Sequence, residues 1–249
     1  MALRAQTATL LIASFPLAAA ASAQSEFRYP ARHDHWRKSC SGTLLITSAG
    51  ISYRQESGKP KKKPHVREWT FDQIQQLTLA PGRIRVLTYD DVRWKLGADR
   101  EQEFLPGAAD LRPVWRMLRS RLDQRLVGAL DGEEFPVLWQ IPVKHLTRFG
   151  GTEGLLVAGA RTIAWRAVRA GASRTWRFAD IDNVSSSGPF QLTLTTFERS
   201  RSHYGNRKGF NFQLKQPLSE ERYTDLWRRL NRDRGLPLLT SISETEKQP

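Results

Sequence analysis

Cysteine is almost absent from the 249-residue sequence, which contains only Cys40, so no disulfide can form within the chain. The fold must therefore be stabilised by packing, which the 39% hydrophobic content and eight tryptophans allow. Cys40 stands between Ser39 and Ser41 at the expected start of a strand. We interpret it as a small core residue. A catalytic thiol would need a setting that lowers its pKa.

Long apolar runs are also missing beyond the N-terminus, which excludes a transmembrane helix in the rest of the chain. Residues 1–23 are typical of a signal peptide, with Arg4 as the positive region, an apolar stretch over 9–21, and a small-x-small site ending at Ala23. We therefore expect export, to the periplasm or outside the cell, after cleavage near Ala23.

Recognisable catalytic motifs are lacking as well, since neither G-x-S-x-G nor H-E-x-x-H occurs. His33 and His35 offer two metal-binding nitrogens, but no third ligand is apparent nearby in sequence. Asp180 and Asp182 can share a face, but they suit a turn equally well. We expect no catalysis, no cofactor and no metal. A hydrolase in which Asp180, Asp182 and His203 converge is a remote alternative.

Acidic residues are scarce relative to basic ones, with 25 Asp and Glu against 39 Lys and Arg, giving a net charge of +14. Such an excess favours anionic partners, namely a lipid surface, an acidic polymer or nucleic acid. Because export is expected, nucleic acid is the least suitable of these. A basic but merely solvated surface is the alternative.

The feature that organises the sequence is an internal repeat. Residues 174–184 repeat residues 67–77 in altered form, with Trp176 and Phe178 matching Trp69 and Phe71. Residues 154–166 likewise match residues 42–54 without a gap, at a spacing of 112 residues. Alternating apolar residues predict strands with one buried face. Both copies are therefore expected to form the same antiparallel structure.

Each copy continues into further strands and then one helix. Strands are predicted over 83–89, 191–197 and 210–214, with either 92–96 or 103–105 completing the first copy. Residues 24–41 are predicted to be an arm or a first strand, and residues 135–143 are extended in character. Helices are predicted over 111–122 and 223–230, capped by Asp110 and Ser219. Four tryptophans are expected in the two cores: Trp69, Trp115, Trp176 and Trp227.

This order of strands, central W-x-F-x-x-I segment and C-terminal helix resembles the pleckstrin-homology-like superfold in its bacterial and GRAM-like forms. The resemblance covers roughly residues 40–127 and 150–236. It implies a mainly β protein with α-helix, made of two tandem units, each an antiparallel bent sheet or barrel closed by an amphipathic helix. The expected divisions are 1–23 signal peptide, 24–127 first unit, 128–238 second unit and 239–249 flexible tail.

Two basic loops differ between the copies and are the predicted ligand-binding residues. One carries four lysines, Lys59, Lys61, Lys62 and Lys63, and the other carries Arg199, Arg201, His203, Tyr204, Arg207 and Lys208. Clustered cations attract acidic lipid by about 1 kcal/mol each near a surface. The resemblance is relevant because pleckstrin-homology-like domains that bind phospholipid use basic loops at this end. A purely solubilising lysine run and an ordinary turn are the structural alternatives.

Together these observations favour a non-catalytic binding or scaffolding module of the bacterial cell envelope. It would contact an anionic envelope component, either a lipid headgroup or an acidic polymer, through its basic loops. The alternative is a protein–protein adaptor that uses the tandem units to hold an envelope protein.

Overall fold

The computed structural model describes residues 26–34, 39–56, 64–92, 97–132, 134–200 and 205–235. Several predicted features lie outside these residues: the signal peptide, the tail from 239, and the ligand-binding candidates Lys59, Lys61, Lys62, Lys63, Arg201, His203 and Tyr204.

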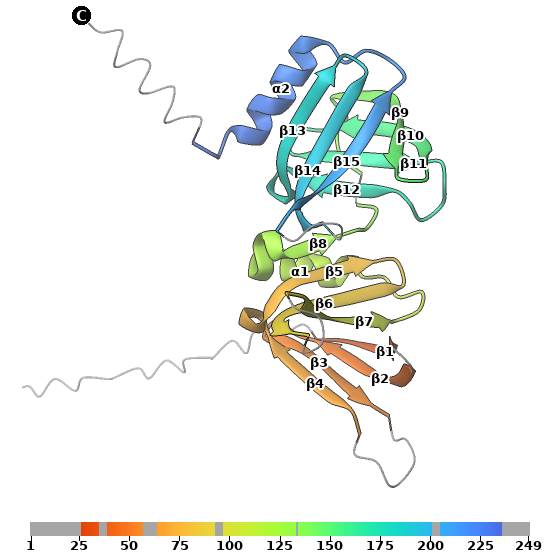
Figure 1. Ribbon diagram of the computed structural model, residues 1–249, viewed down its shortest axis with the longest axis vertical. Helices are drawn as coiled ribbons and strands as arrows, with labels where there is room; N and C mark the ends of the chain where they lie inside the picture. The colour runs from red at the N-terminus through yellow and green to blue at the C-terminus, as the bar shows by residue number, and fades with distance from the viewer. Residues whose placement is uncertain are drawn as a thin grey trace, which may run out of the picture.

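The first unit is built on an eight-stranded sheet (Figure 1). Its strands are β1 (Phe27–Asp34), β2 (Ser39–Ile46), β3 (Gly50–Gln55), β4 (Val66–Thr70), β5 (Ile74–Ala80), β6 (Arg83–Asp91), β7 (Asp99–Leu105) and β8 (Leu126–Gly128). Their order across the sheet is β4-β3-β2-β1-β7-β6-β5-β8. All pairs are antiparallel except β5 with β8. The first strand is thus confirmed. Of the two alternatives for the last strand of this unit, 103–105 lies within β7, and 93–96 lie outside the described residues.

The second unit repeats this plan with a seven-stranded antiparallel sheet. Its strands are β9 (Trp139–Thr147), β10 (Gly150–Ala158), β11 (Thr162–Ala167), β12 (Arg174–Arg177), β13 (Ile181–Gly188), β14 (Gln191–Arg199) and β15 (Arg207–Leu214). Helices α1 (Arg112–Leu122) and α2 (Glu220–Asn231) follow the two runs of strands. The predicted class, mainly β with two helix-closed antiparallel units, is confirmed. Both sheets are open, so the barrel form does not occur in the described residues.

Three short 3-10 turns complete the described elements: η1 (Phe71–Gln73), η2 (Asp123–Arg125) and η3 (Phe178–Asp180). The turns η1 and η3 occupy equivalent places after the tryptophan strands. The chain then enters β5 and β13, two strands that the sequence analysis does not predict. The central motif is therefore a strand, a turn and the start of a second strand.

The strand register confirms the internal repeat. Leu44 pairs with Tyr53 in the first sheet, and Leu156 pairs with Trp165 at the equivalent place in the second. The matched glycines, Gly42 and Gly154, have a shared cause. A Cβ atom at either position would overlap the carbonyl oxygen of the neighbouring strand, that of Arg54 or Arg166. Only glycine allows this close approach of two backbones.

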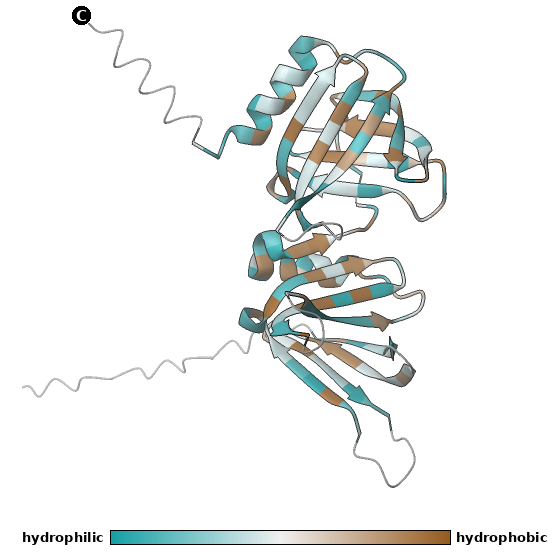
Figure 2. Ribbon diagram, in the orientation of Figure 1, coloured by the Kyte–Doolittle hydropathy of each residue, from teal (hydrophilic) through white to brown (hydrophobic). Residues whose placement is uncertain are grey.

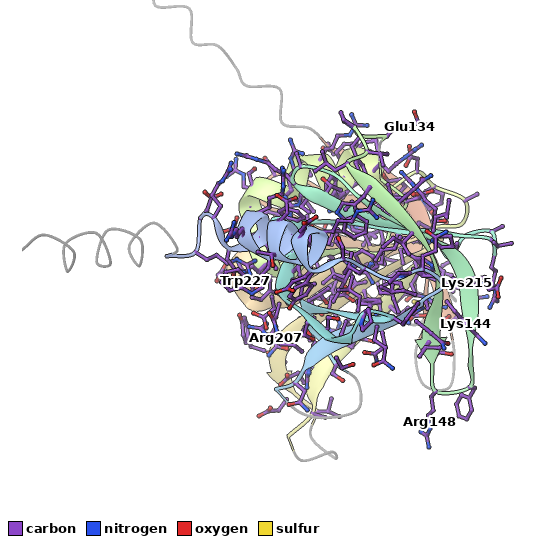
Figure 3. The ribbon with its side chains drawn as sticks, turned by 90° about the horizontal axis from the view of Figure 1, so that it is seen from above. Glu134, Lys144, Arg148, Arg207, Lys215 and Trp227 are labelled. Atoms are coloured by element: carbon purple, nitrogen blue, oxygen red, sulfur yellow. The ribbon has the colours of Figure 1, made fainter. Side chains whose placement is uncertain are left out.

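Each sheet has its own hydrophobic core, to which the strand tryptophans contribute as predicted. Figure 2 shows the alternation of hydrophobic and hydrophilic residues along the strands. Trp176 is 1% exposed and Trp69 is 9% exposed. The prediction for Trp227 is wrong, because this residue is 38% exposed on the outside of α2 (Figure 3). Trp115 is half-buried against the first core.

The helix tryptophans differ from expectation because another row of residues faces each core. In α1 the buried residues are Val114, Leu118 and Leu122, and in α2 they are Leu226 and Leu230. Successive residues of a helix are separated by about 100° around its axis. Trp115 follows the buried Val114 and Trp227 follows the buried Leu226, so both tryptophans lie on the side of their helix. The predicted cap of α2 is confirmed, since Ser219 Oγ accepts from Arg222 N at 3.4 Å. The N-cap of α1 is Leu111 rather than the predicted Asp110, which lies one residue earlier and accepts from Arg112 N at 3.0 Å.

One short segment joins the two sheets (Figure 1). Residues 126–128 form β8 beside β5, and Ala129 N continues this pairing by donating to Leu79 O at 2.8 Å. The next residues turn to the second sheet, where Leu130 O accepts from Thr175 N in β12 at 3.1 Å. An ion pair between Arg199 and Asp99, at 2.7 Å, adds a further contact between the units. The two units therefore meet through backbone and side-chain bonds.

Candidate functional site: an arginine-lined groove between the units

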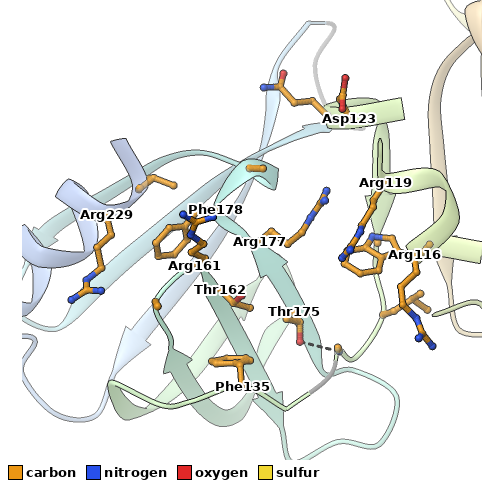
Figure 4. Close-up of a pocket in the computed structure, with 18 of the residues that line it drawn as sticks. Arg116, Arg119, Asp123, Phe135, Arg161, Thr162, Thr175, Arg177, Phe178 and Arg229 are labelled. Atoms are coloured by element: carbon orange, nitrogen blue, oxygen red, sulfur yellow. Dashed lines mark hydrogen bonds between the residues drawn. The ribbon is translucent and has the colours of Figure 1, made fainter. Parts of the chain in front are cut away.

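A groove of about 820 Å³ lies where the two units meet (Figure 4). One wall is α1 of the first unit, and the other consists of η3, β12 and the C-terminal end of α2. Residues of the linking segment form part of the lining between them, including Gly128, Leu130 and Phe135. The volume lies within the range of small-molecule sites, about 300–1,000 Å³. Neither unit supplies this groove alone.

Positive charge dominates the lining. Eight arginines line the groove, against four acidic residues: Arg112, Arg116, Arg119, Arg161, Arg177, Arg229, Arg232 and Arg234, with Asp123, Asp131, Glu134 and Asp233. Arginine keeps its charge at every physiological pH, and its planar fork matches carboxylate and phosphate groups. A concave surface lined mainly by one sign of charge concentrates ligands of the opposite sign.

Some of these arginines hold the structure around the groove. Arg177 forms an ion pair with Asp180 at 2.5 Å, and Arg229 forms one with Asp225 at 2.7 Å. Arg234 donates to the backbone carbonyls of residues 178, 181 and 182, which fixes the end of α2 against η3. These three side chains shape the wall and are already neutralised or hydrogen-bonded.

Other arginines keep their charge uncompensated within the described part of the chain. Arg161 and Arg232 are exposed, and no described carboxylate lies within salt-bridge distance of either. Arg119 is exposed too, with its guanidinium 5.8 Å from the Trp115 ring centre. Arg119 comes from α1, Arg161 from the loop before β11 and Arg232 from the end of α2. Their charges therefore converge on the groove from both units.

Aromatic rings add an apolar component to this basic lining. Trp115, Phe135 and Phe178 all line the groove. Trp115 is held between Gly128, where a Cβ atom would approach its Nε1 to 2.6 Å, and the guanidinium of Arg177, 5.1 Å from its ring centre. The arrangement can therefore bind an anionic group and pack against an adjoining apolar or ring-shaped part of the same ligand.

The described members of the second predicted basic loop have partners within the protein. Arg199 pairs with Asp99 across the units, Lys208 Nζ lies 3.1 Å from Glu198 Oε2, and Arg207 donates to the carbonyl of Phe197 at 3.2 Å. None of these residues lines the groove. Their predicted ligand role stays a prediction, and a ligand there would compete with these internal contacts.

Asp180, one of the two carboxylates considered for catalysis, has a structural explanation. Asp180 accepts from the backbone nitrogen of Arg177 at 3.0 Å and pairs with the guanidinium of the same residue, which stabilises turn η3. His203, the third member of that hydrolase alternative, lies outside the described residues. The expectation that the protein is not an enzyme stays a prediction.

Three side chains of metal-ligand type lie together in the first unit, away from the groove. The ligand atoms of His33, Cys40 and His65 lie within 4.8 Å of one another. From the sequence, His33 and His35 have no third ligand nearby. His35 lies outside the described residues, whereas Cys40 is opposite His33 in the β1–β2 pairing and the ring of His65 stacks on that of His33. The ligands were missed because His65 is 32 positions from His33 in the sequence.

The groove itself was not predicted, although its arginines are visible in the sequence. Arg228, Arg229 and Arg232 lie at the end of the second predicted helix, where a favourable interaction with the helix dipole is enough to explain them. A weak signal exists: both helices carry several arginines outside their buried rows, including Arg112, Arg116 and Arg119 in α1. Nothing in this pattern indicates that the two flanks face each other.

Comparisons with known proteins do not assign the chain to a family. No family model and no curated protein match the sequence. Among solved structures, the Spt16D–Pob3N heterodimer matches with 11% identity and a TM-score of 0.31, over 70% of this chain and 84% of that one. The C-terminal domain of an unknown protein from Leishmania infantum matches with 12% identity and a TM-score of 0.30, over 49% and 98%. Similarity at this level supports no functional argument.

Among the described residues, neither helix has the length and hydropathy needed to cross a membrane.

Proposed function

We propose that the protein is a non-catalytic binding or scaffolding module of the bacterial cell envelope, made of two pleckstrin-homology-like units that hold an anionic ligand between them. The order of seven strands followed by one helix in the second unit supports the pleckstrin-homology-like interpretation. Export to the envelope rests on the signal-peptide pattern of residues 1–23. The basic loops predicted from the sequence would contribute further positive charge.

The observation that carries the proposal is the convergence of Arg119, Arg161 and Arg232 on one groove beside aromatic rings. Uncompensated like charges in a concavity repel one another and lower the stability of the empty protein. A bound anion removes this repulsion and gains charge-assisted hydrogen bonds, each about twice as strong as a neutral one. A groove of this composition therefore favours a ligand with phosphate or carboxylate groups.

The ligand should also carry an apolar or ring-shaped portion, because Trp115, Phe135 and Phe178 line the same groove. A phospholipid headgroup with its glycerol and upper acyl carbons fits this description, and so does a repeating acidic polymer with sugar rings. Both present phosphate or carboxylate groups to arginine. They differ in whether the protein associates with a bilayer.

The test compares soluble and membrane forms of the ligand. The full chain would be titrated with a short-chain phosphatidylglycerol, with polyphosphate, and with vesicles containing phosphatidylglycerol, each over a series of salt concentrations. Changing Arg119, Arg161 and Arg232 together to Gln should weaken binding at least tenfold and reduce its salt dependence. Binding to vesicles only would indicate a bilayer ligand, and binding to polyphosphate would indicate a polymer.

A matched control removes charge elsewhere on the second unit. Arg148, Arg169 and Arg222 are exposed and do not line the groove, so changing these three to Gln should alter binding much less. A further variant with the four lysines at 59 and 61–63 changed to Gln measures the contribution of the predicted lysine loop. Equal losses in the groove and control variants would mean that only overall charge matters, which contradicts a specific groove.

The protein–protein adaptor is a second candidate, and the free edge of β4 supports it. This strand ends the first sheet, and four of its five residues are exposed. An outer strand can pair with an extended segment of another protein through backbone hydrogen bonds. Capture of an envelope protein that is insensitive to salt and abolished by changing Glu68 to Pro would favour this candidate over an anionic ligand.

A further inference from the structure

Three side chains with metal-binding atoms meet where β1, β2 and the segment before β4 come together. His33 and Cys40 are directly opposite each other in the β1–β2 pairing. His33 is fully buried, while Cys40 and His65 are half-buried. Sγ of Cys40 lies 4.0 Å from Nδ1 of His33 and 3.9 Å from Nδ1 of His65. The cluster is therefore reachable from solvent on one side and enclosed on the other.

These separations are close to those of a metal complex. Zinc–sulfur and zinc–nitrogen bonds of about 2.3 Å and 2.1 Å at a tetrahedral angle place sulfur and nitrogen about 3.6 Å apart. The two distances from Sγ of Cys40 to the histidine nitrogens exceed this value by a few tenths of an ångström. Small side-chain rotations can supply such a contraction without moving the strands.

The surroundings orient the ligands as metal sites require. Nε2 of His33 lies 2.7 Å from the side-chain oxygen of Gln102, an acceptor, so Nε2 carries the hydrogen. The lone pair of His33 is then on Nδ1, the nitrogen nearest Cys40. An outer hydrogen bond that fixes the tautomer of a ligating histidine is a regular feature of metal sites.

The other two ligands are also held in place. The Tyr53 hydroxyl donates to the carbonyl oxygen of Cys40 at 3.0 Å and lies 3.3 Å from its Sγ, so it holds this residue in position. The backbone of His65 bonds Gln55 twice: its nitrogen donates to the Gln55 side chain at 3.1 Å, and its carbonyl accepts from Gln55 N at 2.9 Å. The three ligands thus come from positions that the sheet already fixes.

The second unit provides an internal comparison, because it keeps the histidine and lacks the other ligands. His145 pairs with Thr152 and Phe212 in the second sheet, as His33 pairs with Cys40 and Phe104 in the first. Both histidines pack on equivalent rings, His33 on Tyr53 and Phe104, and His145 on Trp165 and Phe212.

Ring packing therefore explains a histidine at this position in both units. It does not explain why the first unit alone adds Cys40, His65 and Gln102. By the strand alignment, the second unit has Thr152, Ala172 and Phe210 at those places, none of which can form a thiolate–imidazole site. The added residues are of the types that can bind a metal ion or orient a ligand by a hydrogen bond.

We propose that His33, Cys40 and His65 bind one soft or borderline d10 metal ion, Cu(I) or Zn²⁺. Thiolate and imidazole are ligands that both ions favour. Three ligands including one thiolate give a neutral complex with Cu(I), which suits the buried side of the cluster. Zn²⁺ would take a water molecule as its fourth ligand. The site is separate from the groove, so neither proposal depends on the other.

The experiment uses the full chain freed of metal with a chelator. Zn²⁺ in one arm and Cu(I), under anaerobic conditions, in the other are titrated against the protein, with bound metal per chain and thermal unfolding as readouts. One equivalent should bind and raise the midpoint of unfolding, because the ion binds the folded state preferentially. In a Co²⁺-loaded sample, the thiolate-to-metal absorption band should be present and should disappear in Cys40→Ser.

Variants separate ligation from folding. His65→Ala should abolish stoichiometric binding, and since His65 is half-buried before β4, this change disturbs the core least. Gln102→Ala should weaken binding about 10–100-fold while keeping the stoichiometry. Thr152→Ala, at the place equivalent to Cys40, should bind as the wild type does. Absence of stoichiometric binding of both ions, or binding that persists in Cys40→Ser and His65→Ala, would overturn the proposal.

Discussion

The buried ion pair of the second unit allows a quantitative test of the structure. Arg174 and Glu198 both have side chains only 9% exposed, and the guanidinium contacts both carboxylate oxygens. Lys208 and the Thr196 hydroxyl also bond this carboxylate, at 3.1 and 3.3 Å. The guanidinium lies 5.2 Å from the Trp176 ring centre. Glu198 is therefore the only carboxylate that compensates Arg174 among the described ion pairs.

Changing Glu198 to Ala should lower the free energy of unfolding by about 3–5 kcal/mol, because it leaves a buried charge without its partner. Nε of Arg174 already has no hydrogen-bond partner among the described residues, so the guanidinium cannot re-form these bonds locally. Arg174→Met combined with Glu198→Leu removes both charges and should recover most of the loss. Urea unfolding of the single and double variants measures the coupling.

The same pair predicts how stability depends on pH. Burial alone would raise the pKa of Glu198, but the charges of Arg174 and Lys208 lower it overall below the ordinary 4.5. Because the pKa of Glu198 is lowered in the folded state, its contribution to the free energy of unfolding is complete above pH 4.5. This contribution is lost as the pH falls through the folded-state pKa. The difference between wild type and Glu198→Ala should shrink in that acidic range. A loss below about 1 kcal/mol at pH 7 would refute the assignment of a buried pair.

Three further predictions follow from burial and contacts. Trp176→Ala should cost about 3–5 kcal/mol of unfolding free energy, whereas Trp227→Ala on the exposed flank of α2 should cost about 1 kcal/mol or less; equal shifts in urea midpoint would contradict their different burial. Gly154→Ala should cost at least about 1–3 kcal/mol, since its Cβ would overlap a strand carbonyl, and an unchanged thermal midpoint would argue against the β10–β11 register. Arg199→Gln should loosen the contact with Asp99 and increase hydrogen exchange at residues 75–76; unaltered exchange would show that this ion pair does not couple the units.

Most of the fold could be predicted because the repeat appears twice and each strand has one buried face. Alternation identified the strands around Trp69 and Trp176, and the match of residues 154–166 with 42–54 aligned the two copies. Strands β5 and β13 were missed because the chain turns sharply through η1 and η3 before them, so each seemed part of the preceding strand and turn. Strand β8, with only three residues, is too short to show a period.

The sites were less predictable because periodicity defines faces within one element and does not pair elements with each other. The groove depends on α1 of one unit facing η3 and α2 of the other. The cluster at Cys40 depends on β3 bringing His65 back beside β1. Trp227 shows a similar limit: helical spacing placed it beside the buried row of α2, and only the packing of Leu226 and Leu230 determines which flank is covered.

The segment from 126 to 132 sets the geometry of the whole assembly, because it is bonded to both sheets within seven residues. Side chains alternate between the two faces of a strand with a period of two residues. Inserting one residue after Ala129 would therefore direct the side chains that follow it in this segment to the opposite face. The segment after Ala129 would then pair with β12 in a shifted register or lose this contact. Insertion of two residues would return these side chains to their original faces and only increase the distance between the two units. In such a series, ligand affinity should therefore be lower for an odd number of inserted residues than for an even number, rather than fall smoothly with the length of the insertion.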